Sequence, residues 1–213
     1  MPKDMCTGSG RFIPDQKNQE TRLPNISSSM PGNSAQIYQP SEDTRLLLGV
    51  AQKELRPGDR VLEVGTGSGY IAADLAREAD VVATDINPYA VAAARNEGVS
   101  IIRADLFAGI RGRFDLVIFN PPYLPTHEEE RINDWLEYAL DGGETGREVI
   151  KRFAEDVHRV LAPAGRILII VSSLTGVNEA CSLFLKEGYC VEIVSRAPVF
   201  GGEELVVLRC IPD

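Results

Sequence analysis

The chain has 213 residues, of which 44% are hydrophobic and 25% charged, a composition typical of a folded globular domain rather than a disordered chain. Its 22 basic and 31 acidic residues give a formal net charge of −9 at pH 7. This argues against direct binding to nucleic acid, because proteins that bind it usually carry a basic surface. No apolar run approaches the roughly 18 residues of a membrane span, and the N-terminus has no apolar signal segment, so we predict a cytoplasmic protein with no membrane role.

The cysteine spacing does not favour a zinc site within the chain. Cys6, Cys181, Cys190 and Cys210 contain no C-x-x-C pair. A domain of this size also buries enough core to fold without disulfide bonds. We therefore predict reduced cysteines in the core and no bound metal.

Residues 1–34 differ in composition from the rest of the chain. They are rich in glycine, proline and serine and show no hydrophobic periodicity. Such a segment lacks the apolar side chains needed to pack a core. We predict a flexible N-terminal leader over residues 1–34 and one folded domain over residues 35–213.

From position 37 onward the pattern becomes regular. Ser41 followed by Glu42 and Asp43 indicates a helix start, with a serine cap and then acids near the positive end of the helix dipole. Amphipathic stretches further along predict helices at 71–77, 89–96, 147–160 and 177–186. Between them, short apolar runs predict strands at 61–64, 81–84, 99–103, 116–119, 166–171, 190–194 and 204–210.

This alternation predicts an α/β fold, with a mainly parallel sheet of seven strands and helices on both faces. The last two strands break the pattern. Only residues 195–203 separate them, which is too few for a parallel crossover. The last strand is therefore expected to run in the reverse direction.

A glycine-rich loop follows the first strand and leads into a helix. Gly65, Gly67 and Gly69 occupy alternate positions, so the backbone can turn tightly and a ligand can approach it closely. The spacing is not the G-x-G-x-x-G of dinucleotide-binding proteins, and the loop has no P-loop lysine. Asp85 ends the second strand, where a carboxylate can accept both hydroxyls of a ribose. We therefore predict a nucleoside site.

Asp105 follows the third strand and has two interpretations. Its carboxylate could accept a hydrogen bond from an adenine amine, or it could cap a helix or turn. The sequence favours neither.

The fourth strand ends in Asn120-Pro121-Pro122-Tyr123. The carboxyl ends of the strands are where ligands bind in such sheets, so this segment is expected to face the ligand of the glycine loop. The prolines stiffen the loop, and the Asn120 side-chain oxygen and the Pro121 carbonyl are two acceptors suited to a planar NH2 group. Tyr123 offers a flat face for stacking.

These motifs resemble those of the class I S-adenosylmethionine-dependent methyltransferases, whose fold is Rossmann-like. Glu63–Gly69 is similar to their first motif and Asp85 to their ribose-binding acid. The resemblance covers residues 37–213. It implies S-adenosyl-L-methionine as cofactor, bound by Tyr38, Thr44, Glu63, Gly65, Gly67, Gly69, Asp85, Ile86, Asp105, Leu106 and Asn120.

The Asn-Pro-Pro-Tyr segment and two others resemble the HemK/PrmC family of glutamine methyltransferases. Residues 37–44 are similar to a segment that precedes the first motif in the short archaeal and eukaryotic branch of the family. Residues 141–148 are similar to a segment shared across the family. The resemblance implies methylation of the glutamine in the Gly-Gly-Gln loop of a class I peptide release factor. It also implies a small zinc-binding activator protein as partner, joined along a sheet edge.

The chemistry predicts roles for the residues of this segment. Asn120 and Pro121 would accept hydrogen bonds from the substrate amide and Tyr123 would stack on it, so we identify these three as catalytic and Pro122 as a further substrate-binding residue. No strong base is needed if the proton leaves after methyl transfer. His127 is a weak candidate participant, and His158 is predicted to be structural.

Three alternatives remain open. The same tetrapeptide occurs in DNA or RNA adenine amino-methyltransferases, although the acidic net charge counts against that reading. Protein lysine methylation is an alternative, as a second activity. A binding module that has lost activity is disfavoured, because the glycine loop, Asp85 and residues 120–123 are intact.

Overall fold

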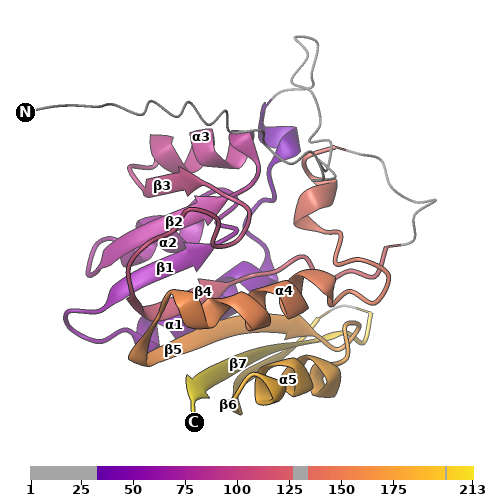
Figure 1. The fold of residues 1–213 in the computed structure, drawn as a ribbon. Helices are drawn as coiled ribbons and strands as arrows, with labels where there is room; N and C mark the ends of the chain where they lie inside the picture. The colour runs from indigo at the N-terminus through magenta and orange to yellow at the C-terminus, as the bar shows by residue number, and fades with distance from the viewer. Residues whose placement is uncertain (1–32, 127–133, 200) are drawn as a thin grey trace, which may run out of the picture.

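The computed structural model describes residues 33–126, 134–199 and 201–213, and Figure 1 shows their arrangement. The predicted leader therefore lies outside the described residues, apart from its last two positions. Those two begin a short 3-10 helix, Asn33–Gln36, which contacts helix α3 (Pro88–Asn96). None of the helices in the described ranges is both long and apolar enough to cross a membrane.

The described chain forms a single seven-stranded sheet in the order β3-β2-β1-β4-β5-β7-β6. Neighbours from β3 to β5 pair in parallel, whereas β7 lies between β5 and β6 and is antiparallel to both. The predicted reversal of the last strand is confirmed. The strands are β1 (Arg60–Val64), β2 (Asp80–Asp85), β3 (Ser100–Arg103), β4 (Phe114–Phe119), β5 (Leu161–Ser172), β6 (Tyr189–Pro198) and β7 (Glu204–Pro212).

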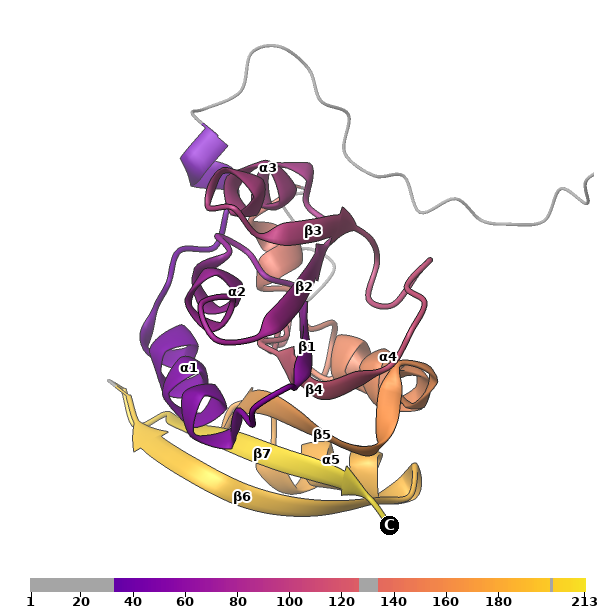
Figure 2. The ribbon, with the colours of Figure 1, turned by 90° about the vertical axis from the view of Figure 1, so that its left-hand side faces the viewer.

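Helices cover both faces of the sheet, as Figure 2 shows. Helices α1 (Glu42–Glu54), α2 (Tyr70–Leu75) and α3 lie on one face, and α4 (Glu148–Asp156) and α5 (Val177–Lys186) on the other. Side chains alternate between the faces along each strand. Val61 thus packs in the cluster that includes α1 and α2, and its neighbour Leu62 packs in the cluster that includes α4 and α5.

Two expectations about local structure need correction. The helix predicted over residues 147–160 ends at Asp156, and a 3-10 turn, Val157–Arg159, continues the same buried face. The prediction that the cysteines lie in the core is wrong for Cys190, which is exposed on edge strand β6; Cys181 is half-buried and Cys210 is buried. Cys6 lies outside the described residues.

A buried arginine ties α1 to the amino ends of the central strands. Arg166 on β5 is 2% exposed, and its Nη2 lies 2.6 Å from Asp59 Oδ2. The same guanidinium pairs with Glu54 and donates to the Asp115 carbonyl. Burial disfavours the charged form of Asp59, but the hydrogen bonds from Arg166 and from the Arg56 backbone outweigh it and lower the pKa of Asp59. This network lies at the opposite end of the strands from the loops described next.

Candidate functional site

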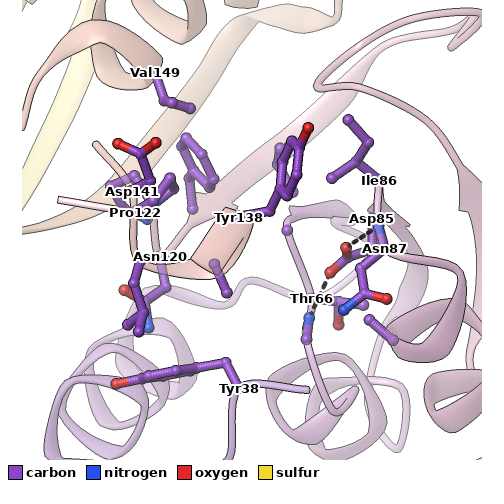
Figure 3. Close-up of a pocket in the computed structure, with 18 of the residues that line it drawn as sticks. Tyr38, Thr66, Asp85, Ile86, Asn87, Asn120, Pro122, Tyr138, Asp141 and Val149 are labelled. Carbon is purple, nitrogen blue, oxygen red and sulfur yellow. Dashed lines mark hydrogen bonds between the residues drawn. The ribbon is translucent and has the colours of Figure 1, made fainter. Parts of the chain in front are cut away.

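A cavity of about 1300 Å³ opens beside the carboxyl ends of β1, β2 and β4. Figure 3 shows Asn120, Pro122 and Asp141 at one end of it and Asp85, Ile86 and Asn87 at the other. This is the position expected for the ligand of a parallel α/β sheet.

The glycine loop forms one wall of the cavity and needs glycine at each of its three positions. Gly65, Gly67 and Gly69 have φ angles of +63°, +57° and +84°, in the left-handed region that other residues rarely adopt. A Cβ on Gly69 would lie 2.9 Å from the Ala94 backbone of α3. Gly65 and Gly67 line the cavity, whereas Gly69 does not and instead allows α2 to pack against α3.

Glu63 holds the loop to the helix that follows it. One oxygen of its buried carboxyl group accepts hydrogen bonds from the Thr66 hydroxyl at 2.5 Å and from the Ala72 backbone N–H at 2.9 Å. Burial raises the pKa of Glu63 to about 8, although these two hydrogen bonds counteract the rise. The side chain therefore shapes the loop as well as lining the cavity.

Asp85 is held just as firmly at the end of β2. Its Oδ2 accepts the Gly67 N–H and its Oδ1 accepts the Asn87 N–H, both at 2.8 Å. Burial raises the pKa of Asp85 to about 6, and the backbone N–H groups limit the rise. Because each carboxylate oxygen has a second lone pair, the group can still accept hydrogen bonds from a ligand.

The Asn120–Tyr123 segment is positioned by the glycine-rich stretch near position 143. Gly142 N–H donates to the Leu124 carbonyl, and the Leu124 N–H donates to the Leu140 carbonyl. The Tyr123 carbonyl accepts from the Thr175 hydroxyl at 3.1 Å. No other described side chain hydrogen-bonds the Asn120 amide, which lines the cavity. The Asn120 side chain is thus free to accept from a ligand.

A buried acid below this loop joins two tyrosines that line the cavity. Asp43 Oδ2 accepts the hydroxyl of Tyr38 at 2.9 Å and that of Tyr123 at 3.2 Å, while Oδ1 accepts the Thr44 N–H and hydroxyl. Burial, followed by the charge of Asp43, raises the pKa of both tyrosines well above the usual range. Both phenols therefore stay protonated donors, and the orientation of Tyr123 depends on Asp43.

The loop after β3 supplies Asp105 and Leu106. Asp105 Oδ2 forms an ion pair with Arg152 of α4 at 2.7 Å. Leu106 has a φ of +47°, the only positive φ outside glycine among the described residues, and its carbonyl accepts from the Thr84 hydroxyl. Both residues line the cavity. The structure gives Asp105 a partner on α4 that neither sequence interpretation foresaw.

Residues 134–141 form the remaining wall. Trp135 is 1% exposed, its ring packs 5.3 Å from that of Tyr138, and the Arg103 guanidinium lies 5.7 Å above it. Its backbone N–H donates to Gln36 Oε1 at 3.0 Å. Tyr138 and Asp141 face into the cavity in Figure 3.

The charge of the lining is strongly acidic. Its basic residues are Arg103 and Arg152, and the latter is paired with Asp105. Its carboxyl groups belong to Asp43, Glu63, Asp85, Asp105, Glu137, Asp141, Glu144, Glu148 and Glu203. Such a cavity suits a cation and disfavours phosphate groups.

The cavity brings together all the predicted site residues except Gly69. Sequence reasoning missed Asp43, Asn87, Trp135, Tyr138 and Arg152 as neighbours of the site. Asp43 was interpreted as a helix-dipole acid, and nothing in the local pattern marks Trp135. His127 lies outside the described residues, and His158 is exposed at a 3-10 turn, away from the cavity. The described ranges contain no group of three or more His, Cys, Asp or Glu side chains arranged to hold a metal ion.

Comparisons with known proteins find methyltransferases. Residues 39–137 match the Methyltransferase small domain family. A protein of Methanocaldococcus jannaschii, provisionally named a protein N5-glutamine methyltransferase, is 40% identical over 186 residues, which cover 82% of this chain and 91% of the relative. The release factor glutamine methyltransferase of Deinococcus radiodurans is 34% identical over 192 residues, which cover 83% of this chain and 68% of the relative.

A solved structure of a similar protein also belongs to a methyltransferase. A chain from the E. cuniculi Mtq2–Trm112 complex, described as responsible for methylation of the translation termination factor eRF1, aligns with a TM-score of 0.71 and 30% identity. The alignment covers 84% of this chain and 99% of that chain.

Proposed function

The chain belongs to the HemK family of protein glutamine methyltransferases, and on that premise we propose that it transfers a methyl group from S-adenosylmethionine to the side-chain amide of a glutamine in the Gly-Gly-Gln loop of a class I peptide release factor. The observation that carries this proposal is the Asn120 side chain. It lines the cavity without a protein partner among the described residues, at the end of the strand beside the glycine loop.

The residues present fit S-adenosylmethionine as the cofactor. Asp85 offers carboxylate oxygens to two ribose hydroxyls, and the Gly65–Gly67 backbone leaves room for close approach of the ligand. The acidic lining favours a cation without phosphate groups, which describes this cofactor and not a dinucleotide. When bound, S-adenosylmethionine supplies an electrophilic methyl group on a positively charged sulfur.

The protein's main contribution is to orient a weak nucleophile. An amide nitrogen reacts poorly because its lone pair is delocalised into the carbonyl. Asn120 Oδ1 and the Pro121 carbonyl would accept its two N–H groups and fix its direction of attack, and Tyr123, held by Asp43, would stack on the amide plane. One N–H proton must leave after transfer, and the carboxyl-rich cavity opens to solvent, which can take it.

Adenine amino-methylation of DNA or RNA is the second candidate, because adenine also presents a planar NH2 group. The acidic lining disfavours a polyanionic substrate. Lysine methylation is the candidate second activity, since an acidic cavity attracts a cationic side chain.

We also propose that the enzyme works with a small zinc-binding activator protein that adds to edge strand β3. The similar E. cuniculi protein was solved in complex with Trm112. Of the two edges of the sheet, β3 is the one that adjoins the cavity, through Arg103, and it exposes Ile102 at 47%. An exposed apolar residue on an edge strand suits strand addition by a partner. The other edge strand, β6, exposes Ile193 at 38%, so it is the position beside the cavity that favours β3.

The test is methylation of a release factor by wild-type protein and Asn120→Ala, with the activator present and absent. Mass spectrometry of the Gly-Gly-Gln peptide should show one added methyl group. Asn120→Ala should lower turnover by about 10²-fold or more, as expected when one positioned hydrogen bond is lost from the transition state. Cofactor affinity should stay within a few-fold. Methylation of DNA or RNA in parallel assays, with none of the release factor, would overturn the proposal.

A further inference from the structure

Gln36 connects two walls of the cavity that are otherwise far apart in sequence. This residue is 5% exposed and lies two positions before Tyr38, at the end of the 3-10 helix Asn33–Gln36. Its backbone carbonyl accepts the Asn87 side-chain N–H at 2.7 Å, and its side-chain Oε1 accepts the Trp135 backbone N–H at 3.0 Å. One residue thus joins the proposed ribose end of the cavity to the wall formed by residues 134–141.

The link reaches the acid proposed to bind the ribose. Asn87 caps α3 through its side chain, and its backbone N–H donates to Asp85 Oδ1 at 2.8 Å. A continuous series of hydrogen bonds therefore runs from Asp85 through Asn87 and Gln36 to Trp135. All four side chains are at least nine-tenths buried.

The wall that Gln36 holds is secured at both ends. At its far end, Asp141 pairs with Leu124, and the Gly142 N–H donates to the Leu124 carbonyl, next to the Asn120–Tyr123 segment. At its near end, Gln36 holds the Trp135 backbone. Arg103 packs over the Trp135 ring and donates to the Ile86 carbonyl, but it makes no hydrogen bond to the wall itself.

We propose that Gln36 is a positioning residue for cofactor binding, which holds the 134–141 wall in place beside the nucleoside end of the cavity. The inference rests on the proposed cofactor. Without this hydrogen bond the wall would have to be ordered when the cofactor binds, and that entropy cost lowers affinity. The far end of the wall stays bound to Leu124 when this hydrogen bond is lost, so the Asn120–Tyr123 segment keeps its place and we expect the chemical step in the saturated enzyme to be unaffected.

The test compares Gln36→Met, which keeps the size of the side chain and removes the acceptor, with Gln36→Glu, which keeps an acceptor. Gln39→Met serves as a matched control on an exposed glutamine three residues away. Calorimetry with S-adenosylmethionine should give a dissociation constant about three- to tenfold weaker for Gln36→Met. Turnover at saturating cofactor should stay within twofold. Gln36→Glu and Gln39→Met should bind S-adenosylmethionine with about the affinity of the wild type.

Trp135 is the chain's single tryptophan, so its fluorescence reports on the wall directly. In ligand-free Gln36→Met we expect red-shifted emission and stronger quenching by acrylamide, both reversed by saturating S-adenosylmethionine. Wild-type affinity together with wild-type emission would overturn the inference. So would an equal loss of affinity and turnover accompanied by a lower melting temperature, because that marks a purely structural role.

Cofactor binding by the wild type distinguishes failure of the proposed function from failure of the role of Gln36. If the wild-type protein does not bind S-adenosylmethionine, the cofactor assignment falls, and the role of Gln36 in cofactor binding falls with it. If the wild type binds and Gln36→Met binds equally well, only the role of Gln36 falls. Should Gln36→Met fail to fold, Gln36→Asn replaces it with the same expected outcomes, because it stays polar while withdrawing the acceptor by one methylene.

Discussion

At the scale of single residues, the site depends on carboxyl groups that the fold keeps out of water. Asp85, Glu63 and Asp43 are all at least nine-tenths buried, yet each accepts at least two hydrogen bonds from the protein. Burial favours the neutral form and these hydrogen bonds favour the charged form. For Asp85 and Glu63 burial outweighs the hydrogen bonds, so the pKa of each of these two carboxyl groups is raised.

Asp85 should make cofactor binding depend on pH. Burial raises its pKa to about 6 from the ordinary 3.8. The folded state therefore holds this proton more tightly than the unfolded chain, so the contribution of Asp85 to stability falls as the pH rises from about 4 to 6. Ribose hydroxyls bind best to the ionised form. The dissociation constant for S-adenosylmethionine should weaken below pH about 6, by up to roughly tenfold per pH unit.

Titration calorimetry between pH 5 and 8 measures this dependence. Asp85→Asn is the control, because it should bind S-adenosylmethionine more weakly at every pH, and its dissociation constant should not change near pH 6. Glu63, with a pKa of about 8, is present in both proteins, and its pKa should fall in Asp85→Asn because the Asp85 charge helps to raise it. A pH dependence of binding that persists in Asp85→Asn is therefore assigned to Glu63 and not to position 85. A flat wild-type profile would rule out ionised Asp85 as the ribose ligand.

At the scale of elements, the catalytic loop depends on close backbone packing. Gly146 has a φ of +72°, and a Cβ there would lie 2.5 Å from the Tyr123 carbonyl oxygen. The two segments can touch only because this residue has no side chain. The glycine-rich stretch at 142–146 thus packs directly against the Asn120–Tyr123 segment and fixes its position.

Gly146→Ala should displace that segment and lower turnover by about 10²-fold, the order expected when a catalytic group moves by about 1 Å. S-adenosylmethionine affinity should change little, because Asp85 and the glycine loop are untouched. Gly58→Ala is the matched control: its φ is +86°, but nothing lies within 4 Å of the added Cβ. Both variants pay about 1–2 kcal/mol for the left-handed backbone. If Gly58→Ala loses as much turnover as Gly146→Ala, backbone strain and not displacement of the loop is the cause.

At the scale of the whole molecule, local patterns predict the frame of the site better than its walls. The glycine loop, Asp85 and Asn120 follow strands that are adjacent in a parallel sheet, so strand order alone brings them together. The reversed last strand follows from a short connection. These inferences need only residues that are close in sequence and the usual topology of α/β folds.

The walls come from contacts across long stretches of chain. Trp135 meets Gln36 across 99 positions, and Tyr123 meets Asp43 across 80. Asp43 looks like an ordinary first-turn acid, because its actual partners are phenols brought there by tertiary packing. No periodicity or spacing encodes such pairs, so they became visible only in the structure.

The stability of the whole fold should depend strongly on one residue far from the site, Arg166. Its guanidinium is 2% exposed, and it pairs with Asp59 and Glu54 at the amino ends of the strands. Removing one partner of a buried ion pair leaves an uncompensated charge, which typically costs about 3–5 kcal/mol. In a domain of this size, Arg166→Met should lower the melting temperature by roughly 6–20 °C.

Calorimetric unfolding of Arg166→Met and of Arg77→Met tests this prediction. Arg77 is the control, because its ion pair with Asp74 is exposed and should contribute little.

The lowered pKa of Asp59 adds a pH signature: its contribution to stability is present above its ordinary pKa of 3.8 and is lost as the pH falls through the lowered value. The difference in melting temperature between the wild type and Arg166→Met should therefore become smaller at acidic pH. Cofactor affinity of the folded variant should match wild type, because the strands separate the network from the cavity. Equal melting temperatures for Arg166→Met and Arg77→Met at neutral pH would mean that the buried arginine contributes no more than a surface ion pair.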